Sequence, residues 1–428
     1  MEYRKLKELA FISISNVDKK TSGSEKPVRL CNFVDVYRNW AITAHMTDQL
    51  MVATAKQSEI DRFSLHKGDV CITKDSETKD DIGMATYIAD DIENLVLGYH
   101  CARISPKKEL LSGKFLNAFL HTMFVRKFYE LNASGSGQRY TLSLDAIGEI
   151  PVPVLPLEEQ RKRAEVLSLI DRKIEINKTV NDNLQHQLRI LYDYWFTQFD
   201  FPNAERKPYR SSGGHMIWNS LAKMQIPDGW EACSLKDAIQ HIHTGLNPRD
   251  NFTLGNGNIK YVTVKNLTLN GSIDFKGCDT IDEDARRKVH NRSDIMIGDI
   301  LFASIAPLGR CYLITTPPTN WDINESVFSI RPNNILSPEY LYAFLTSDRF
   351  IYSATNRSTG SIFKGIRIND LMDTKVIVPT ADVLYAFSRF ANKILMQKSI
   401  ISQENEALLN QRNWILPMLM SGQATIAD

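Results

Sequence analysis

Two glycine-containing segments of the chain carry side chains that can make paired, directional hydrogen bonds. Residues 134–140 read Ser-Gly-Ser-Gly-Gln-Arg-Tyr, and residues 357–364 read Arg-Ser-Thr-Gly-Ser-Ile-Phe-Lys. Amide and guanidinium groups present several donors in one plane, an aromatic ring offers a flat face, and glycine leaves the loop backbone free to position them. These residue types suit the recognition of a planar, polar ligand. For any single residue, a solvated surface loop is an equally good interpretation.

The two segments occupy corresponding places in an internal repeat. Leu6-Lys7-Glu8 returns as Leu235-Lys236-Asp237, 229 positions later, and Lys67-Gly68-Asp69-Val70 returns as Ile297-Gly298-Asp299-Ile300, 230 positions later. Several further matches keep the same order. A unit of about 225 residues is much longer than a solenoid repeat, whose period is roughly 20 to 50 residues. The repeat therefore predicts a duplicated domain that meets two similar ligands.

Each repeat begins with a mixed segment of strands and helices. The short runs at 70–73, 261–264 and 300–303 have strand composition and lie between Gly, Asn and Asp turns. Residues 113–131 and 338–353 carry apolar side chains at helical spacing. The predicted fold class is therefore α+β. Both mixed segments end in proline-bearing strands, and proline stops a strand from continuing in a ladder.

A long heptad seam follows each mixed segment. Its positions step by three and four residues, a pattern typical of a coiled coil. In the first repeat the members are Leu167, Ile170, Ile174, Asn177, Asn181, Leu184, Leu188, Leu191 and Trp195. A shift of 224 positions gives the seam of the second repeat: Ile394, Lys398, Ile401, Asn405, Leu408, Arg412, Ile415 and Leu419. The shift places Asn181 and Asn405 at the same seam position, where a buried polar residue would specify register.

The matching seams predict that the two helices pack against each other. A helix of about 40 residues is roughly 60 Å long, so the pair would form an antiparallel coiled coil that separates two tandem domains related by a pseudo-twofold axis. Two ordinary core helices are the alternative. The expected boundaries are 1–155 for the first domain, 156–200 for the first spacer helix, 201–226 for a linker, 227–380 for the second domain and 381–422 for the second spacer helix.

Composition narrows the class of protein. With 51 Lys and Arg against 50 Asp and Glu, the net charge of +1 argues against a chain that neutralises a long nucleic-acid backbone alone. The six cysteines form no CxxC pair and have no nearby histidine cluster, so we expect neither a disulfide framework nor a zinc site. This cysteine usage fits a reducing cytoplasm. No signal peptide is recognisable, and no apolar run approaches the roughly 18 residues needed to span a bilayer, so we expect no membrane partner.

Catalytic signatures are missing from the sequence. No glycine-rich loop ends in Gly-Lys-Ser/Thr, and the Asn/Asp-Pro-Pro-aromatic pattern of adenine methyltransferases does not occur. Glu205-Arg206-Lys207 has the Glu-x-Lys ending of some nucleases, but it lies in the expected linker. No Ser-His-Asp or Cys-His arrangement stands out among the nine histidines. We therefore expect that the chain is not an enzyme by itself, with no catalytic residue, no metal site and no cofactor of its own.

The order of these features resembles the specificity subunit of a Type I restriction-modification system. The residues that carry the resemblance are Ser212-Gly213-Gly214-His215-Met216-Ile217-Trp218, Pro227-Asp228-Gly229-Trp230, Gly298-Asp299-Ile300-Leu301, Val152-Pro153 through Pro156-Leu157-Glu158-Glu159-Gln160, and Leu416-Pro417-Met418-Leu419-Met420-Ser421-Gly422-Gln423. They span nearly the whole chain. The sequence departs from the family pattern at two places, so the residue at which each domain starts is not defined by these motifs. The first repeat lacks the Pro-x-Gly-Trp opening, and Ala381-Asp382-Val383 replaces the Leu-Glu-Glu-Gln junction of the second.

The resemblance implies a division of labour between subunits. Each repeat would be a target-recognition domain that reads one half of a bipartite site in double-stranded DNA. The helices would hold the domains apart and bind two methyltransferase subunits. Those partners would carry S-adenosylmethionine for methylation of adenine N6, and restriction/translocase subunits would use ATP and Mg for cleavage in phage defence. Partner subunits would also supply phosphate contacts, which accommodates the small net charge.

The resemblance also makes the polar loops candidates for DNA contact. Arg and Lys pair with guanine edges, and Asn and Gln pair with adenine edges. The candidates in the first domain are Lys74, Ser136, Gln138, Arg139 and Tyr140, and those in the second domain are Arg249, Lys265, Arg357, Ser361, Phe363 and Lys364. Lys74 and its neighbour Lys79 are equally compatible with phosphate contacts or with ordinary surface.

A non-DNA alternative is a coiled-coil adaptor that presents two protein-binding domains. The charge balance does not separate the two hypotheses, whereas co-purification with a methyltransferase would. An enzyme with an unfamiliar site would instead show activity as the purified chain alone.

Overall fold

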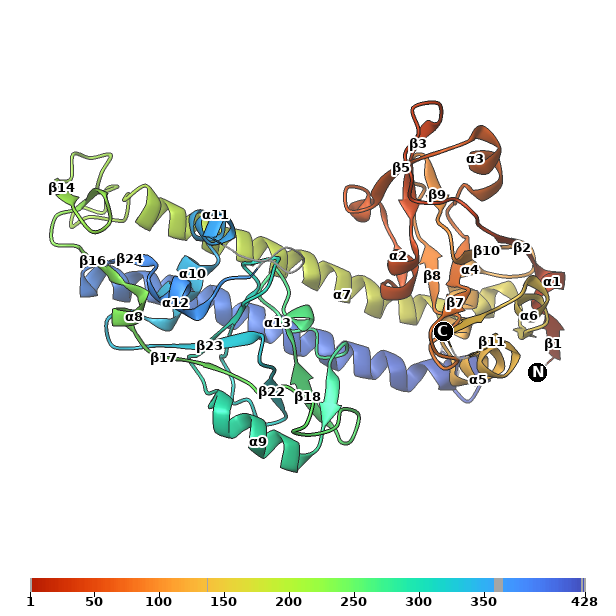
Figure 1. Ribbon diagram of the computed structural model, residues 1–428. Coiled ribbons are helices and arrows are strands. Elements are labelled where there is room, and N and C mark those ends of the chain that lie inside the picture. The colour runs from red at the N-terminus through yellow and green to blue at the C-terminus, as the bar shows by residue number, and fades with distance from the viewer. Residues whose placement is uncertain (1, 137, 358–364, 425, 427–428) are drawn as a thin grey trace. The chain divides into compact units, whose positions relative to one another are not determined.

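The structure, a computed structural model, describes residues 2–136, 138–357, 365–424 and 426, without the side chain of Ser136. The chain forms two compact units. The first unit comprises residues 1–175 and 406–428, and the second comprises residues 176–405. Each unit combines an α+β domain with part of two long helices, α7 (Leu157–Tyr192) and α13 (Ala381–Ser421) (Figure 1).

The first unit is built on a five-stranded sheet with the order β2-β10-β6-β8-β4. Smaller sheets have the orders β5-β3-β9, β11-β12-β7 and β1-β13. The strands are β1 (Glu2–Lys5), β2 (Ala10–Ile14), β3 (Lys26–Cys31), β4 (Ala41–Ile42), β5 (Met51–Ala55), β6 (Val70–Thr73), β7 (Asp75–Ser76), β8 (Ala85–Ile88), β9 (Leu95–Leu97), β10 (Cys101–Pro106), β11 (Ser134–Ser136), β12 (Arg139–Thr141) and β13 (Pro151–Val154). The helices are α1 (Leu6–Leu9), α2 (Phe33–Arg38), α3 (Gln57–Phe63), α4 (Gly113–Leu120), α5 (Met123–Asn132) and α6 (Leu144–Gly148), with a 3-10 turn η1 (Ala44–Met46).

Local sequence explains several of these elements. Thr122 begins α5 because its hydroxyl accepts a hydrogen bond from the backbone NH of Val125, and Ser143 begins α6 in the same way. All four residues of β6 are buried, as expected for a central strand. The core continues from Phe115 of α4 to Leu167 of α7 and Leu419 of α13. Burial of these apolar side chains attaches both long helices to the first domain.

The second unit is built on a four-stranded sheet with the order β17-β23-β20-β21. Its smaller sheets have the orders β19-β18-β22, β16-β24 and β14-β15. The strands are β14 (Met216–Asn219), β15 (Met224–Pro227), β16 (Glu231–Ser234), β17 (Ile239–Thr244), β18 (Ile259–Val262), β19 (Asp279–Ile281), β20 (Ile300–Ala303), β21 (Cys311–Leu313), β22 (Trp321–Ile323), β23 (Val327–Pro332) and β24 (Lys375–Val378). The helices are α8 (Leu235–Ala238), α9 (Glu283–Ser293), α10 (Pro338–Leu345), α11 (Asp348–Arg357) and α12 (Ile368–Met372), with a 3-10 turn η3 (Val264–Asn266).

The topology repeats between the units. β1 pairs with β13 just before α7, and β16 pairs with β24 just before α13. The small sheets agree in direction as well: β3 is parallel to β9 and antiparallel to β5, while β18 is parallel to β22 and antiparallel to β19. The α+β class and the internal repeat expected from the sequence are therefore confirmed.

The two long helices run antiparallel within each unit. In the first unit, Arg163 Nη1 donates to the carbonyl of Leu419 at 2.7 Å, and Arg412 Nη1 donates to Asp171 Oδ1 at 2.8 Å. In the second unit, Asn177 Nδ2 donates to Asn405 Oδ1 at 2.8 Å. As the residue number rises on α7, that of the partner on α13 falls. This order confirms the antiparallel coiled coil.

The seam positions point inward along both helices. Ile170, Ile174, Asn181, Leu188, Trp195, Ile401 and Leu419 are buried, and Leu184, Leu191, Ile394, Asn405, Leu408 and Ile415 are half-buried. Trp195 lies beyond the end of α7, in a π-helical turn η2 (Asp193–Thr197). The polar contact across the seam joins Asn177, rather than Asn181, to Asn405. Asn181 and Asn405 are equivalent in the repeat, but the register of the two antiparallel helices, and not equivalence in the repeat, decides which residues meet.

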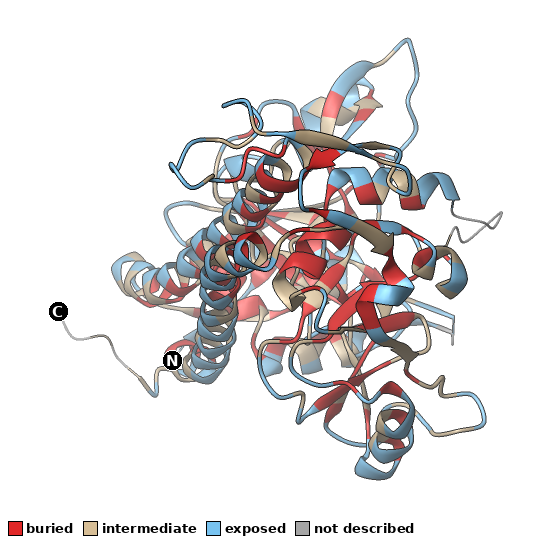
Figure 2. Ribbon diagram, turned by 90° about the vertical axis from the view of Figure 1, so that its left-hand side faces the viewer, coloured by how far each residue is buried: buried red, intermediate tan, exposed pale blue. Residues whose placement is uncertain are grey.

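Residues 201–226, where the sequence predicts a linker, contain turns and all but the last residue of a hairpin formed by β14 and β15. Phe201 and Ile226 are buried in the core of the second unit. Figure 2 shows the buried residues gathered where helices and sheets pack, with exposed residues along the outer faces of the helices. Among the described residues, no helix is long and apolar enough to cross a bilayer.

Candidate nucleic-acid interface

The small sheet β11-β12-β7 brings the candidate residues of the first domain together. Tyr140 of β12 pairs with Ser76 of β7, and Arg139 pairs with Ser136 of β11. Lys74 directly precedes β7, and Gln138 lies exposed in the turn between β11 and β12. Residues that are far apart in the sequence therefore share one edge of the first domain.

A single carboxylate organises this edge. The side chain of Asp75 is only 9% exposed. Lys74 Nζ lies 3.0 Å from Asp75 Oδ2, His100 Nδ1 lies 2.5 Å from the same oxygen, and Arg139 Nη2 lies 3.5 Å from it. Burial acts to raise the pKa of Asp75, but hydrogen bonds from Thr141, His100 and Lys74 outweigh it and lower the pKa below its ordinary value. Asp75 therefore holds the three basic side chains as a fixed negative charge.

Arg139 keeps most of its guanidinium available to solvent. Its side chain is 56% exposed, and Nη2 lies 2.5 Å from Nδ1 and 2.9 Å from Nε2 of His100. A guanidinium only donates hydrogen bonds, so His100 can accept from Arg139 only through a ring nitrogen that carries no proton. The contacts fix the direction of Arg139 while leaving other donors free for a ligand.

Aromatic side chains flank these cations. Lys79 Nζ lies 5.3 Å from the centre of the Tyr140 ring, a cation–π distance. The exposed ring of Tyr99 contacts His100, with 3.5 Å between ring centres. We refer to Lys74, Asp75, Tyr99, His100, Lys79, Arg139 and Tyr140 as the Asp75 cluster. Its exposed cations can contact phosphates or guanine edges, and its rings can stack on bases.

Sequence reasoning identified Lys74, Lys79, Arg139 and Tyr140 but missed Asp75, Tyr99 and His100. Asp75 and His100 belong to different strands or turns and are joined only by the fold. His100 adopts a positive φ of 70°, which is uncommon outside glycine and is not visible in residue spacing. The sequence offered no signal that could have placed these residues beside Arg139.

The candidates of the second domain are more dispersed. Arg357 is the last residue of α11, and its Nη2 donates to Ser353 Oγ at 2.7 Å. Lys265 lies in η3, 3.5 Å from Asp279, and Arg249 is exposed in the turn after β17. No hydrogen bond joins these three side chains within the described ranges. Ser361, Phe363 and Lys364 lie outside the described residues.

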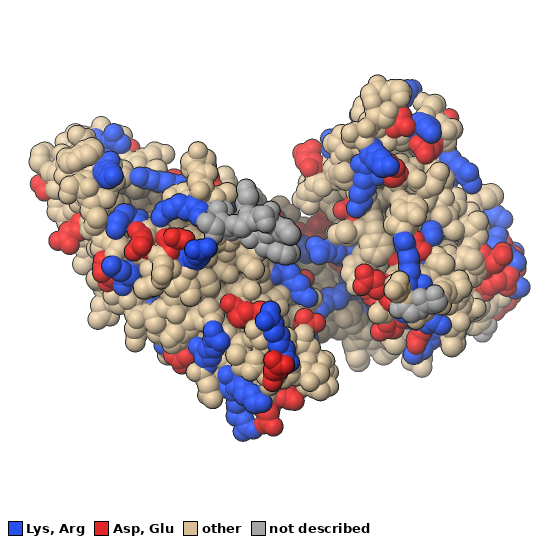
Figure 3. Space-filling model, viewed as in Figure 1, with Lys and Arg blue, Asp and Glu red and all other residues tan. Residues whose placement is uncertain are grey.

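The position that corresponds to Asp75 is chemically different. Gly68-Asp69 corresponds to Gly298-Asp299, and counting onward from these pairs places Ile305 where the first domain has Asp75. Ile305 forms an antiparallel bridge with Gly365, just as Asp75 pairs with Thr141. The two domains therefore offer the same place in the fold with different side chains. Figure 3 shows Lys and Arg interspersed with Asp and Glu over the viewed surface, in agreement with the net charge of +1.

Comparison with known proteins identifies the family. The family profile described as the Type I restriction modification DNA specificity domain matches residues 1–186 and again residues 227–402. The chain therefore belongs to the family of Type I restriction-modification specificity subunits, as the sequence features predict. Members of this family are non-catalytic, and the expectation that the chain is not an enzyme is confirmed on that ground.

Individual relatives are distant but cover most of the chain. The Type I restriction enzyme HindI specificity subunit of Haemophilus influenzae is 21% identical over 409 residues, which are 84% of this chain and 87% of the relative. The MjaIX specificity subunit of Methanocaldococcus jannaschii is 24% identical over 352 residues, 80% of this chain and 76% of the relative. The crystal structure of a Type I S subunit from M. genitalium aligns with a TM-score of 0.48 and 15% identity, covering 97% of this chain and 95% of that one.

Proposed function

We propose that this specificity subunit reads a bipartite site in double-stranded DNA, with one half-site for each domain. The observation that carries the proposal is the Asp75 cluster, in which a buried carboxylate orients the exposed side chain of Arg139 among cations and aromatic rings. Such a group combines phosphate contact with base readout. Ile305 at the corresponding position gives the second domain a different surface, which fits two unlike half-sites.

The proposal includes two methyltransferase subunits bound to the long helices. Large apolar side chains face outward at repeated positions: Ile176 and Ile190 on α7 correspond to Ile400 and Trp414 on α13 under the shift of 224 residues. Ile190 is 54% exposed and Trp414 is 68% exposed. Contiguous exposed apolar surface marks protein interfaces, and we propose that these repeated side chains contribute to one. Two equivalent sets support docking of two copies of one partner.

The remaining chemistry is assigned to the partners. The methyltransferase subunits would bind S-adenosylmethionine and methylate adenine N6, while restriction/translocase subunits would bind ATP and Mg. The chain would act in the cytoplasm, where the DNA and these partners meet. Family membership supports this division, because the chain itself belongs to a non-catalytic family.

The experiment is reconstitution followed by mapping of methylated adenines by single-molecule sequencing. The full chain mixed with its methyltransferase should methylate one bipartite sequence, and the chain alone should transfer no methyl groups. A double variant, Ile190→Ser with Trp414→Ser, should lower the yield of the complex. The control Val52→Ser, at an exposed apolar side chain of strand β5 in the first domain, should not. Stable binding of other proteins with no methyltransferase and no sequence-dependent methylation would favour the adaptor hypothesis instead.

A further inference from the structure

Two histidines project from one face of strand β17 in the second domain. β17 pairs with β23 so that His241 faces Arg331 and His243 faces Ser329. A register shift between Ile239 and His241 inserts one residue into β17. Strand β2 of the first domain has a regular register, with Phe11 opposite Ser105 and Ser13 opposite Arg103. The bulge thus distinguishes the second domain, and bulges commonly redirect side chains near functional sites.

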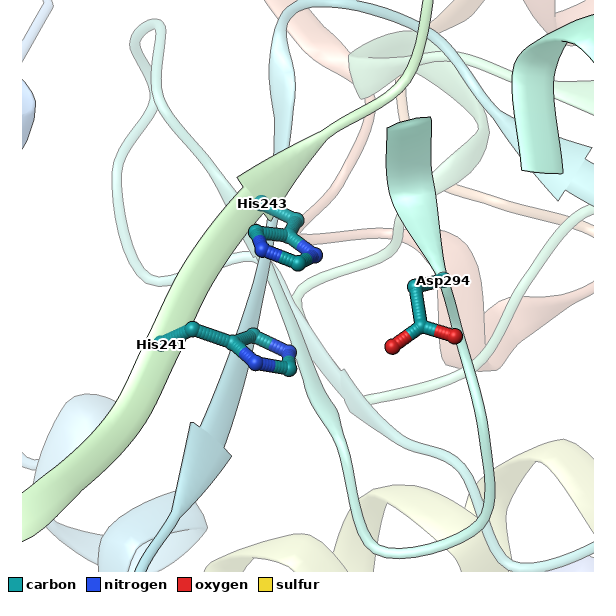
Figure 4. Close-up of side chains that lie close together, drawn as sticks. All are labelled: His241, His243 and Asp294. Atoms are coloured by element: carbon teal, nitrogen blue, oxygen red, sulfur yellow. The ribbon is translucent and has the colours of Figure 1, made fainter. Parts of the chain in front are cut away.

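Asp294 completes a group of three possible metal ligands. It follows the last turn of α9 and adopts a left-handed conformation with φ of 44°. The two imidazole rings are stacked with 3.8 Å between ring centres and 2° between ring planes. One potential ligand atom from each of His241, His243 and Asp294 lies within 4.8 Å of the others. Figure 4 shows both rings extending from β17 toward the side on which Asp294 lies.

The imidazoles have nitrogen atoms available for a ligand. His241 Nε2 and His243 Nδ1 are buried atoms without a hydrogen-bond partner, and a buried polar atom without a partner costs stability. A neutral imidazole coordinates a metal ion through the ring nitrogen that carries no proton.

The charges around the group favour a cation despite the presence of Arg331. Arg331 makes a two-pronged contact with the fully buried Asp299, through Nε to Oδ1 at 2.7 Å and Nη2 to Oδ2 at 2.9 Å. Its Nη1 lies 3.1 Å from Asp294 Oδ2, which leaves Oδ1 of Asp294 for another ligand. Two carboxylates therefore surround one guanidinium. A hydrogen bond to a ligating carboxylate is the usual way in which a neighbouring group orients a metal ligand.

We propose that His241, His243 and Asp294 bind a divalent transition-metal ion of the Zn²⁺ class in the second domain. Two imidazoles and one carboxylate suit Zn²⁺, Ni²⁺ or Cu²⁺, whereas Mg²⁺ and Ca²⁺ prefer oxygen ligands. Zn–N and Zn–O bonds of about 2.0 to 2.2 Å require the three side chains to close on the ion. Asp294 is exposed at the end of a helix and can make this movement. The ion would tie β17 to the end of α9, with solvent as a further ligand.

The test is titration of Zn²⁺ into the full chain after treatment with a chelator and dialysis. Calorimetry should report one site, and Zn²⁺ should raise the thermal unfolding midpoint because an ion that binds the folded form stabilises it. Cu²⁺ in place of Zn²⁺ should give an electron paramagnetic resonance spectrum with nitrogen hyperfine structure from two imidazoles. Millimolar Mg²⁺ should have neither effect.

Variants taken from the first domain keep the strand while removing the ligands. His241→Phe with His243→Ser installs the residues that β2 carries at the corresponding register positions, Phe11 and Ser13. Asp294→Asn retains a residue type that tolerates the left-handed conformation. Each variant should lose at least the roughly 10- to 100-fold in metal affinity that follows loss of a supporting group. Circular dichroism checks that the variants remain folded.

A matched control is His215→Ala, which removes an exposed histidine whose Nδ1 lies 3.2 Å from Oδ2 of Asp228. It should leave Zn²⁺ affinity unchanged. Equal Zn²⁺ affinity of the original chain and the folded His241→Phe/His243→Ser variant would overturn the proposal. Absence of Zn²⁺ binding by the original chain at 100 µM, about 100 times a micromolar Kd, would also overturn it.

Discussion

Arg412 donates a hydrogen bond to Asp171 across the helix pair of the first unit, at 2.8 Å between Nη1 and Oδ1. The two side chains are 12% and 13% exposed, and the Arg412 guanidinium also lies 4.6 Å from the centre of the Trp40 ring. The shift of 224 residues maps Arg412 to Leu188 and Asp171 to Leu395, both buried in the core of the second unit. The spacing of the seam is therefore repeated, but its side chains are not. In the first unit the ion pair favours one register of α7 against α13.

Loss of one member of this pair should destabilise the first unit. Arg412→Ala removes a cation from beside the poorly solvated carboxylate of Asp171, so we expect the free energy of unfolding to fall by about 2 to 4 kcal/mol. Urea denaturation followed by circular dichroism measures the change. The control is the double variant Arg412→Leu with Asp171→Leu, which copies the apolar pair of the second unit. Because this variant removes both charges, its free energy of unfolding should be within about 1 kcal/mol of that of the original chain, or higher. Equal losses of stability in both variants would show that packing, and not charge, dominates.

Arg139→Ala and Lys364→Ala should each affect recognition of one half-site. The two residues belong to corresponding segments of separate domains, and a base contact through two hydrogen bonds is worth about 1 to 3 kcal/mol of discrimination. The expected result is relaxed methylation at one position of one half-site for each variant, measured by mapping methylated adenines. Lys127→Ala removes an exposed cation on α5 outside the Asp75 cluster and should leave the sites unchanged. A uniform loss over all sequences would identify phosphate contacts instead.

Stability of the second unit should depend on pH through Lys398. Burial lowers the pKa of Lys398 to about 7, although the negative charge of Asp182 opposes this shift. Nζ of Lys398 donates hydrogen bonds to the carbonyl of Asn270, at 2.5 Å, and to Gln185. Between about pH 7 and the unfolded value of about 10.4, the unfolded chain binds the proton more tightly than the folded chain. The free energy of unfolding should therefore rise with pH in this window, by up to about 1.4 kcal/mol per pH unit, and lose that gain as pH falls to 7.

Lys398→Ile should flatten this rise, since Ile174 occupies the corresponding position of the first seam. Urea denaturation at several pH values from about 7 to 10 measures the slope. Lys393→Ile, at an exposed position of the same helix, is the matched control and should retain the slope. An unchanged slope in Lys398→Ile would show that other groups set the pH dependence.

The length of the long helices should set the spacing of the DNA half-sites. Insertion of four residues after Glu175 adds about one helical turn and about 6 Å, so the seam still faces inward and the two half-sites should lie one or two base pairs further apart, at about 3.4 Å each. An insertion further along α7 would disturb the core of the second unit, in which Leu188 is buried. Mapping methylated sites measures the spacing.

Insertion of two residues at the same place is the control for this experiment. Two residues rotate the following seam by about 200°, which turns its apolar positions away from the partner helix, so methylation should be lost rather than shifted. A four-residue variant that is active with its original spacing would contradict the role of the helices as a ruler.

The sequence determined those features that depend on local order. The heptad positions from Leu167 to Trp195 predicted a long helix because apolar residues at intervals of three and four share one helical face. The pairs Gly68-Asp69 and Gly298-Asp299 revealed the repeat. Each Asp accepts a hydrogen bond from the backbone NH three residues earlier, which is that of His66 or Met296. Both patterns lie within short segments of the chain, so they can be recognised without knowledge of the fold.

Tertiary structure decided which distant residues meet. The shift of 224 residues makes Asn181 and Asn405 equivalent, yet Asn177 contacts Asn405. The reason is that α7 and α13 run in opposite directions, so their register decides which residues meet. His100 reaches Asp75, and Asp294 approaches His241, only because separate strands and a helix end are assembled around buried cores. Contact across such distances depends on the register and packing of whole elements, which residue spacing along the chain does not encode.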